Sequence, residues 1–282
     1  MSIKIMEPYT FTKGDSPLLI SMPHSGTRLL SEMESRLTPE AKSLPDTDWY
    51  LPELYRFLGE MPVSVISANY SRYVVDLNRS INDEPLYKTK TTGLFPEILF
   101  SDNPIFLPGM HHTEVLKNTI KTEIWMPYHR KLAAELERIR DKFGYAILFD
   151  AHSIASEVPM LFEGQLPDLN FGNNAGLSCS DLMLARLAQI SEKSEYSHVC
   201  NGRFKGGFIT RSYGQPENNI HSIQLELSQA TYLSGSLESY QLDNEKLPKI
   251  AALLKQLIES LLTIGNPAEM KTFTHKNEVC DD

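Results

Sequence analysis

The sequence predicts one α/β domain built on a mixed β-sheet, and three apolar runs carry this prediction. Residues 18–22, 146–149 and 223–227 have the length and composition of buried strands, and amphipathic helical patterns separate them. No internal repeat and no change in composition marks a linker. We therefore expect a single domain over residues 1–265 and a patternless tail over residues 266–282.

The elements before the long central helix alternate as such a domain requires. A short strand and a turn at residues 13–17 lead into the first core strand. Apolar residues at helical spacing predict a helix over residues 48–58. Alternating and β-branched residues predict strands at residues 62–68 and 73–77.

A long loop and a long helix follow. Residues 78–110 are rich in Pro, Thr, Gly and Asp, so we expect an irregular loop, and loops of this length are often functional. Residues 113–142 show the apolar spacing of an amphipathic helix, which Pro127 could interrupt. Gly144 stands where a helix C-terminus favours glycine, and it leads into the central strand.

The second half of the chain contains two further predicted helices. Residues 159–178 are loop-like, and Ser180 is placed to cap a helix over residues 180–193. Residues 201–219 are dense in Gly, Arg and Lys, and residues 245–264 have the pattern of a final amphipathic helix.

The composition excludes some classes of partner. The 282 residues are 41% hydrophobic and 22% charged, as in ordinary globular proteins. The net charge of −9 argues against a nucleic acid partner, because phosphate binding requires a basic field. A small anionic substrate needs only a local group of cations, so it stays compatible with this charge.

Membrane and disulfide signals are lacking. No apolar run reaches the roughly 18 to 20 residues of a membrane span, and residues 1–13 do not resemble a signal peptide. We therefore expect no membrane partner and a cytoplasmic location. The three cysteines are far apart and form no C-x-x-C pair, so the ligands of any bound metal should be histidine and carboxylate.

Two histidines stand at the ends of predicted buried strands. His24 follows the strand at residues 18–22, and alone it would more often bond a backbone carbonyl than a metal. His152 follows Asp150, whose carboxylate can orient the imidazole as acids behind metal-bound histidines do. Because strand ends meet at one edge of an α/β sheet, both imidazoles and one carboxylate could form the open three-ligand site of a catalytic zinc.

The carboxylate ligand should be Asp46 or Asp48, which precede a predicted helix beginning near Trp49. An aspartate at this place also caps a helix, so one member of the pair can cap while the other binds metal. Spacing does not choose between them. We slightly favour Asp46 as the ligand, because Asp48 is the better placed cap.

Several cations could hold an anionic substrate. Arg72 and Arg79 flank residues 73–77, where they could simply be solvated or ion-paired. Alternatively, Arg79 with Asn78 grips a substrate carboxylate, and Arg72 meets negative charge developing on a carbonyl oxygen. The glycine-rich stretch over residues 201–214 could add an anion-binding patch. Its cations are Arg203, Lys205 and Arg211.

Glu226 is an acidic residue within an apolar strand. A buried unpaired charge costs several kcal/mol, so Glu226 is either exposed at an edge or used in function. Beside a metal-activated water it would be the general base, with a pKa raised by the apolar strand and lowered by the cation.

Six short segments combine into one recognisable pattern. They are residues 23–28, 46–49, 70–79, 150–153, 201–207 and 224–227. Together they resemble the N-formylglutamate amidohydrolase family, in family order and over about residues 18–235. The resemblance implies a zinc-dependent enzyme with a mixed sheet flanked by helices on both faces, of the zinc-carboxypeptidase and phosphorylase/hydrolase type. In the related carboxypeptidases and aspartoacylases a glutamate ligand follows the first histidine by three residues, whereas Thr27 stands there in this chain.

The resemblance implies hydrolysis of N-formyl-L-glutamate to formate and L-glutamate, a step of histidine degradation. His24, His152 and Asp46 or Asp48 would hold zinc, although such ligands also suit other divalent ions. Glu226 would move the proton, Arg72 would face the oxyanion, and Asn78 with four cations would bind the substrate. Those four are Arg79, Arg203, Lys205 and Arg211. The alternatives are a deacylase of acetyl- or succinyl-amino acids, and a dicarboxylate-binding protein without catalysis.

Overall fold

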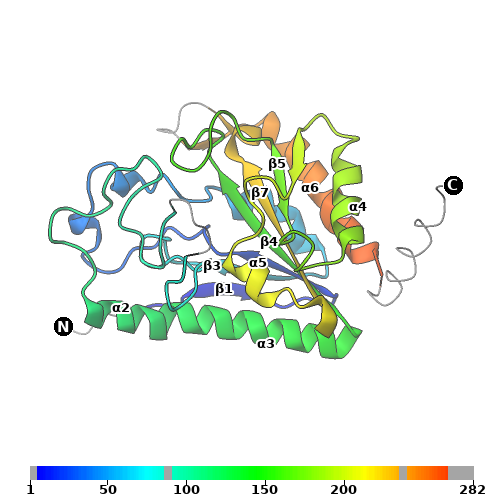
Figure 1. The fold of residues 1–282 in the computed structure, drawn as a ribbon, viewed down its shortest axis with the longest axis horizontal. Helices are drawn as coiled ribbons and strands as arrows, with labels where there is room; N and C mark the ends of the chain where they lie inside the picture. The colour runs from blue at the N-terminus through cyan, green and yellow to red at the C-terminus, as the bar shows by residue number, and fades with distance from the viewer. Residues whose placement is uncertain (1–4, 86–90, 235–239, 266–282) are drawn as a thin grey trace.

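A computed structural model gives the fold (Figure 1), and it describes residues 5–85, 91–234 and 240–265. The predicted tail over residues 266–282 lies outside the described residues. The strands are β1 (Tyr9–Thr12), β2 (Leu18–Met22), β3 (Ser64–Ala68), β4 (Ala146–Ile154), β5 (Leu169–Gly172), β6 (His198–Cys200), β7 (Ile220–Ser228), β8 (Leu233–Ser234) and β9 (Gln241–Leu242). The α-helices are α1 (Leu51–Leu54), α2 (Glu114–Ile120), α3 (Met126–Phe143), α4 (Asp181–Ser191), α5 (Phe208–Tyr213) and α6 (Lys246–Thr263).

Within the described residues, seven strands form a mixed sheet in the order β1-β3-β2-β4-β7-β5-β6. The strands β3, β2, β4 and β7 run parallel, whereas β1 is antiparallel to β3 and β5 is antiparallel to β7. Every residue of β2, β4 and β7 is buried, as expected for parallel strands with both faces covered. The predicted α/β fold with a mixed sheet is confirmed.

Helices cover both faces of the sheet (Figure 1). On one face Leu132 of α3 belongs to the same buried cluster as Leu148 of β4. On the other face Met183 of α4 and Leu257 of α6 share a cluster with Phe149 of β4. Each such side chain contributes about 1.5–3 kcal/mol when it leaves water, so alternate residues of one strand stabilise both layers.

The long helix runs almost unbroken from Glu114 to Phe143. The Thr113 hydroxyl accepts a hydrogen bond from the Leu116 amide and caps its start. A π-helical turn, Lys121–Trp125, precedes Pro127 in the first turn of α3, so the missing proline N–H does not end the helix. Gly144 ends it with a left-handed φ of 82°, as the sequence predicted.

The strand predicted at residues 73–77 is wrong. This segment forms turns, in which the Val74 amide donates to the Ser71 carbonyl and the Asp76 amide donates to the Leu94 carbonyl. Its apolar side chains are nevertheless buried, because the segment lies under the loop that follows it. The apolar, β-branched residues at 73–77 therefore indicate that the segment is buried, and they do not indicate an extended backbone.

Other elements differ in length or were not predicted. The helix expected over residues 48–58 shortens to α1 and a 3-10 helix, Arg56–Glu60. Sequence reasoning missed β5, β6, α5, β8 and β9, which are too short to show a period. Among the described residues, no helix combines the length and hydropathy that a membrane crossing requires.

Candidate active site

The carboxyl ends of three neighbouring parallel strands bring the predicted residues together. His24 follows β2 by two residues, while His152 lies near the end of β4 and Glu226 near the end of β7. Strand pairing sets His152 directly beside Glu226. These side chains therefore gather at the edge of the sheet where open α/β proteins place their chemistry.

His24, Asp48 and His152 form a buried cluster of three donor groups. Each offers one ligand atom, and these atoms all lie within 4.8 Å of one another. The Asp48 amide donates to the His24 carbonyl at 3.1 Å, and the Ser153 amide donates to Oδ2 of Asp48 at 3.2 Å. Two imidazoles and one carboxylate are the donor set of an open zinc site, so the three residues fit a divalent cation.

Asp46 is not part of this cluster. Its carboxylate accepts hydrogen bonds from the Tyr73 hydroxyl at 2.9 Å and from the Phe100 amide at 3.2 Å. Burial raises the pKa of Asp46 to about 6. The geometry thus runs against our slight preference for Asp46 as the ligand, since of these two aspartates it is Asp48 whose carboxylate lies in the cluster with the histidines.

Asp48 also lacks the capping role that we expected of it. The short helix α1 follows Tyr50, and no side chain caps its first turn. The Asp48 side chain instead lies 3.3 Å from Nδ1 of His152, measured from Oδ2. The sequence could not reveal this, because both aspartates precede the helix closely and either could have faced the sheet.

A buried network fixes the first histidine. The Nε2 atom of His24 lies 2.7 Å from Oδ1 of Asp76, and the Arg72 guanidinium donates to Oδ2 of Asp76 at 2.7 Å. Burial would raise the pKa of Asp76, but His24 and Arg72 outweigh it and hold the pKa well below its ordinary value. Sequence reasoning gave Asp76 no role, although it is an acid within an apolar run, the signal that singled out Glu226.

A second group of polar side chains surrounds His152. Its Nε2 atom lies 3.2 Å from Oδ2 of Asp150 and 3.0 Å from Nδ2 of Asn78. Burial would lower the pKa of His152, but Asp150 and Asp48 outweigh it and raise the pKa well above its ordinary value. The acidic groups around the cluster therefore favour positive charge at this point.

Glu226 is buried at the same edge of the sheet. The Gln224 amide nitrogen donates to its Oε2 atom at 3.1 Å. Burial raises the pKa of Glu226 to about 8, against the lowering effect of His152. A carboxyl group with such a pKa can exchange protons near neutral pH, which is what general acid–base catalysis requires.

A small pocket of about 70 Å³ joins these groups to two of the predicted substrate-binding cations. Arg79 and Arg203 line it together with His24, His152 and Glu226. Arg79 donates to the Thr92 carbonyl at 2.8 Å, and Arg203 donates to the Leu161 carbonyl at 2.5 Å. Both guanidinium groups are therefore anchored at the pocket wall.

The other two predicted cations lie outside the lining of this pocket. Lys205 is exposed, and Nε of Arg211 donates to the Gly206 carbonyl at 2.8 Å. Gly207 lines the pocket by close approach instead, because a Cβ atom there would collide with the amide of Asn78. The glycine-rich stretch thus contributes the Arg203 charge to the pocket, and its Gly207 allows the backbone to pass close to Asn78.

Two imidazoles, a carboxylate, a buried glutamic acid and arginines in one pocket are typical of metal-assisted hydrolases of anionic substrates. Comparison with known proteins narrows this class. The sequence profile described as N-formylglutamate amidohydrolase matches residues 16–233, and the chain belongs to that family. The resemblance carried by the six sequence segments is confirmed.

Individual relatives agree with this family. The chain is 50% identical over 261 residues to the N-formylglutamate deformylase of Pseudomonas aeruginosa. These aligned residues make up 92% of this chain and 97% of that protein. It is 48% identical over 257 residues to the N-formylglutamate deformylase of Pseudomonas putida, covering 91% and 96% of the two chains. The crystal structure of an N-formylglutamate amidohydrolase from Ralstonia eutropha JMP134 shares the fold with a TM-score of 0.77 at 19% identity, covering 89% of this chain and 96% of that one.

Proposed function

We propose that this protein hydrolyses N-formyl-L-glutamate to formate and L-glutamate, in the cytoplasm and as a step of histidine degradation. Water adds to the formyl carbon, and the bond between that carbon and the amide nitrogen breaks. Two relatives about half identical to this chain carry the name of this activity. The observation that carries the proposal is the pocket where Glu226 and three arginines lie beside His24 and His152.

We assign His24, Asp48 and His152 as the residues that would hold one divalent cation, which we take to be zinc. Their burial and mutual distances within 4.8 Å support this assignment, as does the preference of zinc for imidazole and carboxylate. When bound, the cation would polarise the formyl oxygen and make a water molecule more acidic. Asp76 and Asp150 would orient the two imidazoles from behind.

Glu226 would take the proton from the attacking water and return it to the amide nitrogen as the C–N bond breaks. The pKa of Glu226 would fall from about 8 once positive charge binds beside His152. This places it in the range where a carboxyl group can both accept and return a proton. Its fixed place on β7 keeps it next to the proposed ligands.

Each arginine of the pocket would bind a different negatively charged group of the substrate. Arg72 lines the pocket and is held by Asp76, so it could face the carbonyl oxygen as negative charge develops there. Arg79 and Arg203 would hold the two carboxylates of the glutamate moiety, for which a single cation would not suffice.

Formate release from N-formyl-L-glutamate tests the activity, measured before and after chelation and again after zinc is added back. Glu226→Gln should keep its metal and lose about 100- to 10,000-fold in kcat, the contribution of a general acid–base group. Glu135→Gln is a matched control, because this buried glutamate accepts from Ser64 at 2.6 Å and lies outside the pocket lining. Absence of formate release by the wild-type protein would refute the function, whereas full activity of Glu226→Gln would refute only the role of Glu226.

A further inference from the structure

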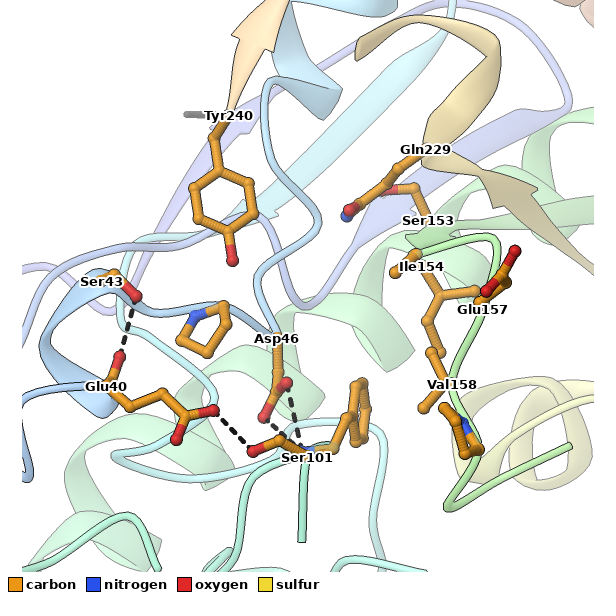
Figure 2. A pocket seen from close by; sticks show the side chains of 14 residues that line it. Glu40, Ser43, Asp46, Ser101, Ser153, Ile154, Glu157, Val158, Gln229 and Tyr240 are labelled. Carbon is orange, nitrogen blue, oxygen red and sulfur yellow. Dashed lines mark hydrogen bonds between the residues drawn. The ribbon is translucent and has the colours of Figure 1, made fainter. Parts of the chain in front are cut away.

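The pocket that holds the proposed catalytic groups shares three lining residues with a larger cavity of about 410 Å³. Figure 2 shows the side chains that line this larger cavity. Phe100, Ser153 and Ile154 line both spaces. Ser153 and Ile154 end the central strand β4, whereas Phe100 belongs to the loop between β3 and α2. The aromatic ring in this shared wall is therefore contributed by the loop and not by the sheet.

Phe100 is fixed beside the residue proposed to face the substrate carbonyl. Its backbone amide donates to the Asp46 carboxylate at 3.2 Å, which anchors the loop. The Arg72 guanidinium lies over its ring, 4.9 Å from the ring centroid. The ring also packs against the small apolar cluster that contains Ile154 and Val158. Contacts on these sides hold the ring in the wall.

We propose that Phe100 restricts the acyl group of the substrate to formyl, and that the larger cavity is acyl space which the ring closes off. This inference rests on the proposed function. Arg79 and Arg203 would take the carboxylate end of the substrate, so the acyl end lies toward Arg72 and the Phe100 ring. A formyl carbon carries only hydrogen, whereas a longer acyl chain must extend through the wall.

The charges around the larger cavity sharpen the expected selectivity. Glu40, Asp46 and Glu157 line it (Figure 2), and none of the described lining residues is Lys, Arg or His. Its remaining walls include the apolar side chain of Val158 and the ring of Tyr240. Once opened, this space would accept an uncharged acyl chain and would reject a chain that ends in a carboxylate.

Phe100→Ala tests the inference with three substrates, N-formyl-, N-butyryl- and N-succinyl-L-glutamate. The last two carry four-carbon acyl chains that differ in the terminal carboxylate. The ratio of kcat/KM for butyryl to that for formyl should rise by about tenfold or more, because a single misfit methylene costs about 10- to 200-fold in a tight pocket. The ratio for succinyl to formyl should rise far less.

Ser43→Ala is the matched control, because Ser43 lines the larger cavity and not the smaller pocket, and its hydroxyl donates to the Glu40 carbonyl at 2.8 Å. It should leave all three ratios at the wild-type values. Phe100→Leu, which removes less of the wall, covers the case that Phe100→Ala fails to fold, and it should give a smaller gain of the same sign. Calorimetric binding of N-butyryl-L-glutamate to metal-free protein adds a measurement without turnover, and Phe100→Ala should bind it about tenfold more tightly than wild type.

Three results would overturn the role of Phe100 in a wild-type protein that releases formate. They are no gain for butyryl in either Phe100 variant, an equal gain for succinyl, and a comparable gain in Ser43→Ala. If the wild-type protein releases no formate, the proposed function fails by itself. The calorimetric comparison then still decides whether Phe100 closes the larger cavity.

Discussion

His24 and Asp76 form a buried pair, in which Nε2 of the imidazole lies 2.7 Å from Oδ1 of the carboxylate. The other oxygen of Asp76 accepts from Arg72, so the carboxylate is fixed from both sides. A histidine held at one ring nitrogen presents the other nitrogen in a set direction. Asp76 therefore supports the orientation that a metal ligand needs, although it is not itself in the cluster of donors.

Asp76→Asn should weaken metal binding by about 10- to 100-fold, as the loss of an outer carboxylate does at other sites. Zinc affinity measured by competition with a chelator gives this quantity directly. Asp168→Asn is a suitable control, because its carboxylate accepts a hydrogen bond from the Ser197 hydroxyl and lies outside the pocket lining. Wild-type affinity in Asp76→Asn would show that His24 does not depend on this pair.

Asp48→Asn and Asp46→Asn separate the two aspartates that the sequence left open. Asp48→Asn removes one of the three clustered donors, so it should lose zinc by more than the roughly 100-fold expected for an outer partner. Asp46→Asn should keep one zinc per chain, because its carboxylate bonds Tyr73 and Phe100 instead. Metal content after dialysis distinguishes them, and the opposite pattern would return the ligand role to Asp46.

His129 should make the stability of the fold depend on pH. It is buried, with Nε2 2.9 Å from the Leu77 carbonyl and Nδ1 2.9 Å from the Tyr213 hydroxyl. Burial lowers the pKa of His129 to about 3, whereas in the unfolded chain it stays near 6.5. Between these values the unfolded state binds the extra proton, so the free energy of unfolding falls as pH falls, by up to about 1.4 kcal/mol per pH unit.

His129→Gln removes this contribution, so its free energy of unfolding should fall less steeply below pH 6.5 than that of the wild type. Urea denaturation at pH 7.5, 6 and 5 measures the slope. Burial also lowers the pKa of His112, to about 4, so His112 contributes to the same fall in the free energy of unfolding. A variant that replaces both histidines should therefore show a still weaker dependence of this free energy on pH. An unchanged slope in His129→Gln would mean that the pKa of His129 is nearly the same in the folded and unfolded states, against the expected lowering by burial.

Gly207→Ala should damage both stability and activity. The new Cβ atom would collide with the amide of Asn78, which lies 3.0 Å from Nε2 of His152. Overpacking of this kind costs about 1–3 kcal/mol, and displacement of Asn78 would disturb the imidazole. Gly59→Ala is the control, because a Cβ atom there meets nothing within 4 Å. Thermal unfolding together with formate release measures both effects, and wild-type values for Gly207→Ala would contradict the close approach.

Much of the site could be predicted because its chemistry stands on buried strands. The apolar runs that become β2, β4 and β7 are visible in the sequence, and polar residues at their ends have few structural reasons to be there. Parallel pairing then brings His24, His152 and Glu226 to one edge. In this part of the chain, local pattern and tertiary structure agree.

The choice between Asp46 and Asp48 could not be predicted, because it depends on contacts between distant segments. The Asp48 amide bonds the His24 carbonyl, and the Asp46 carboxylate bonds the Phe100 amide. The strand predicted at residues 73–77 failed for a related reason, since burial under a loop selects the same apolar residues as a sheet does. Spacing along the chain records neither kind of contact.

The direct pairing of His152 with Glu226 on adjacent strands has a consequence for how the protein would lose activity on heating. Their separation is set by the backbone ladder at the centre of the sheet, whose amide hydrogens should exchange with solvent only when the whole molecule opens. Arg79 and Phe100, by contrast, lie outside the sheet, in the segment between β3 and α2, and segments without a central strand ladder usually open at a lower free energy. On gradual warming, the selectivity between acyl substrates should therefore fall at a lower temperature than the rate of hydrolysis.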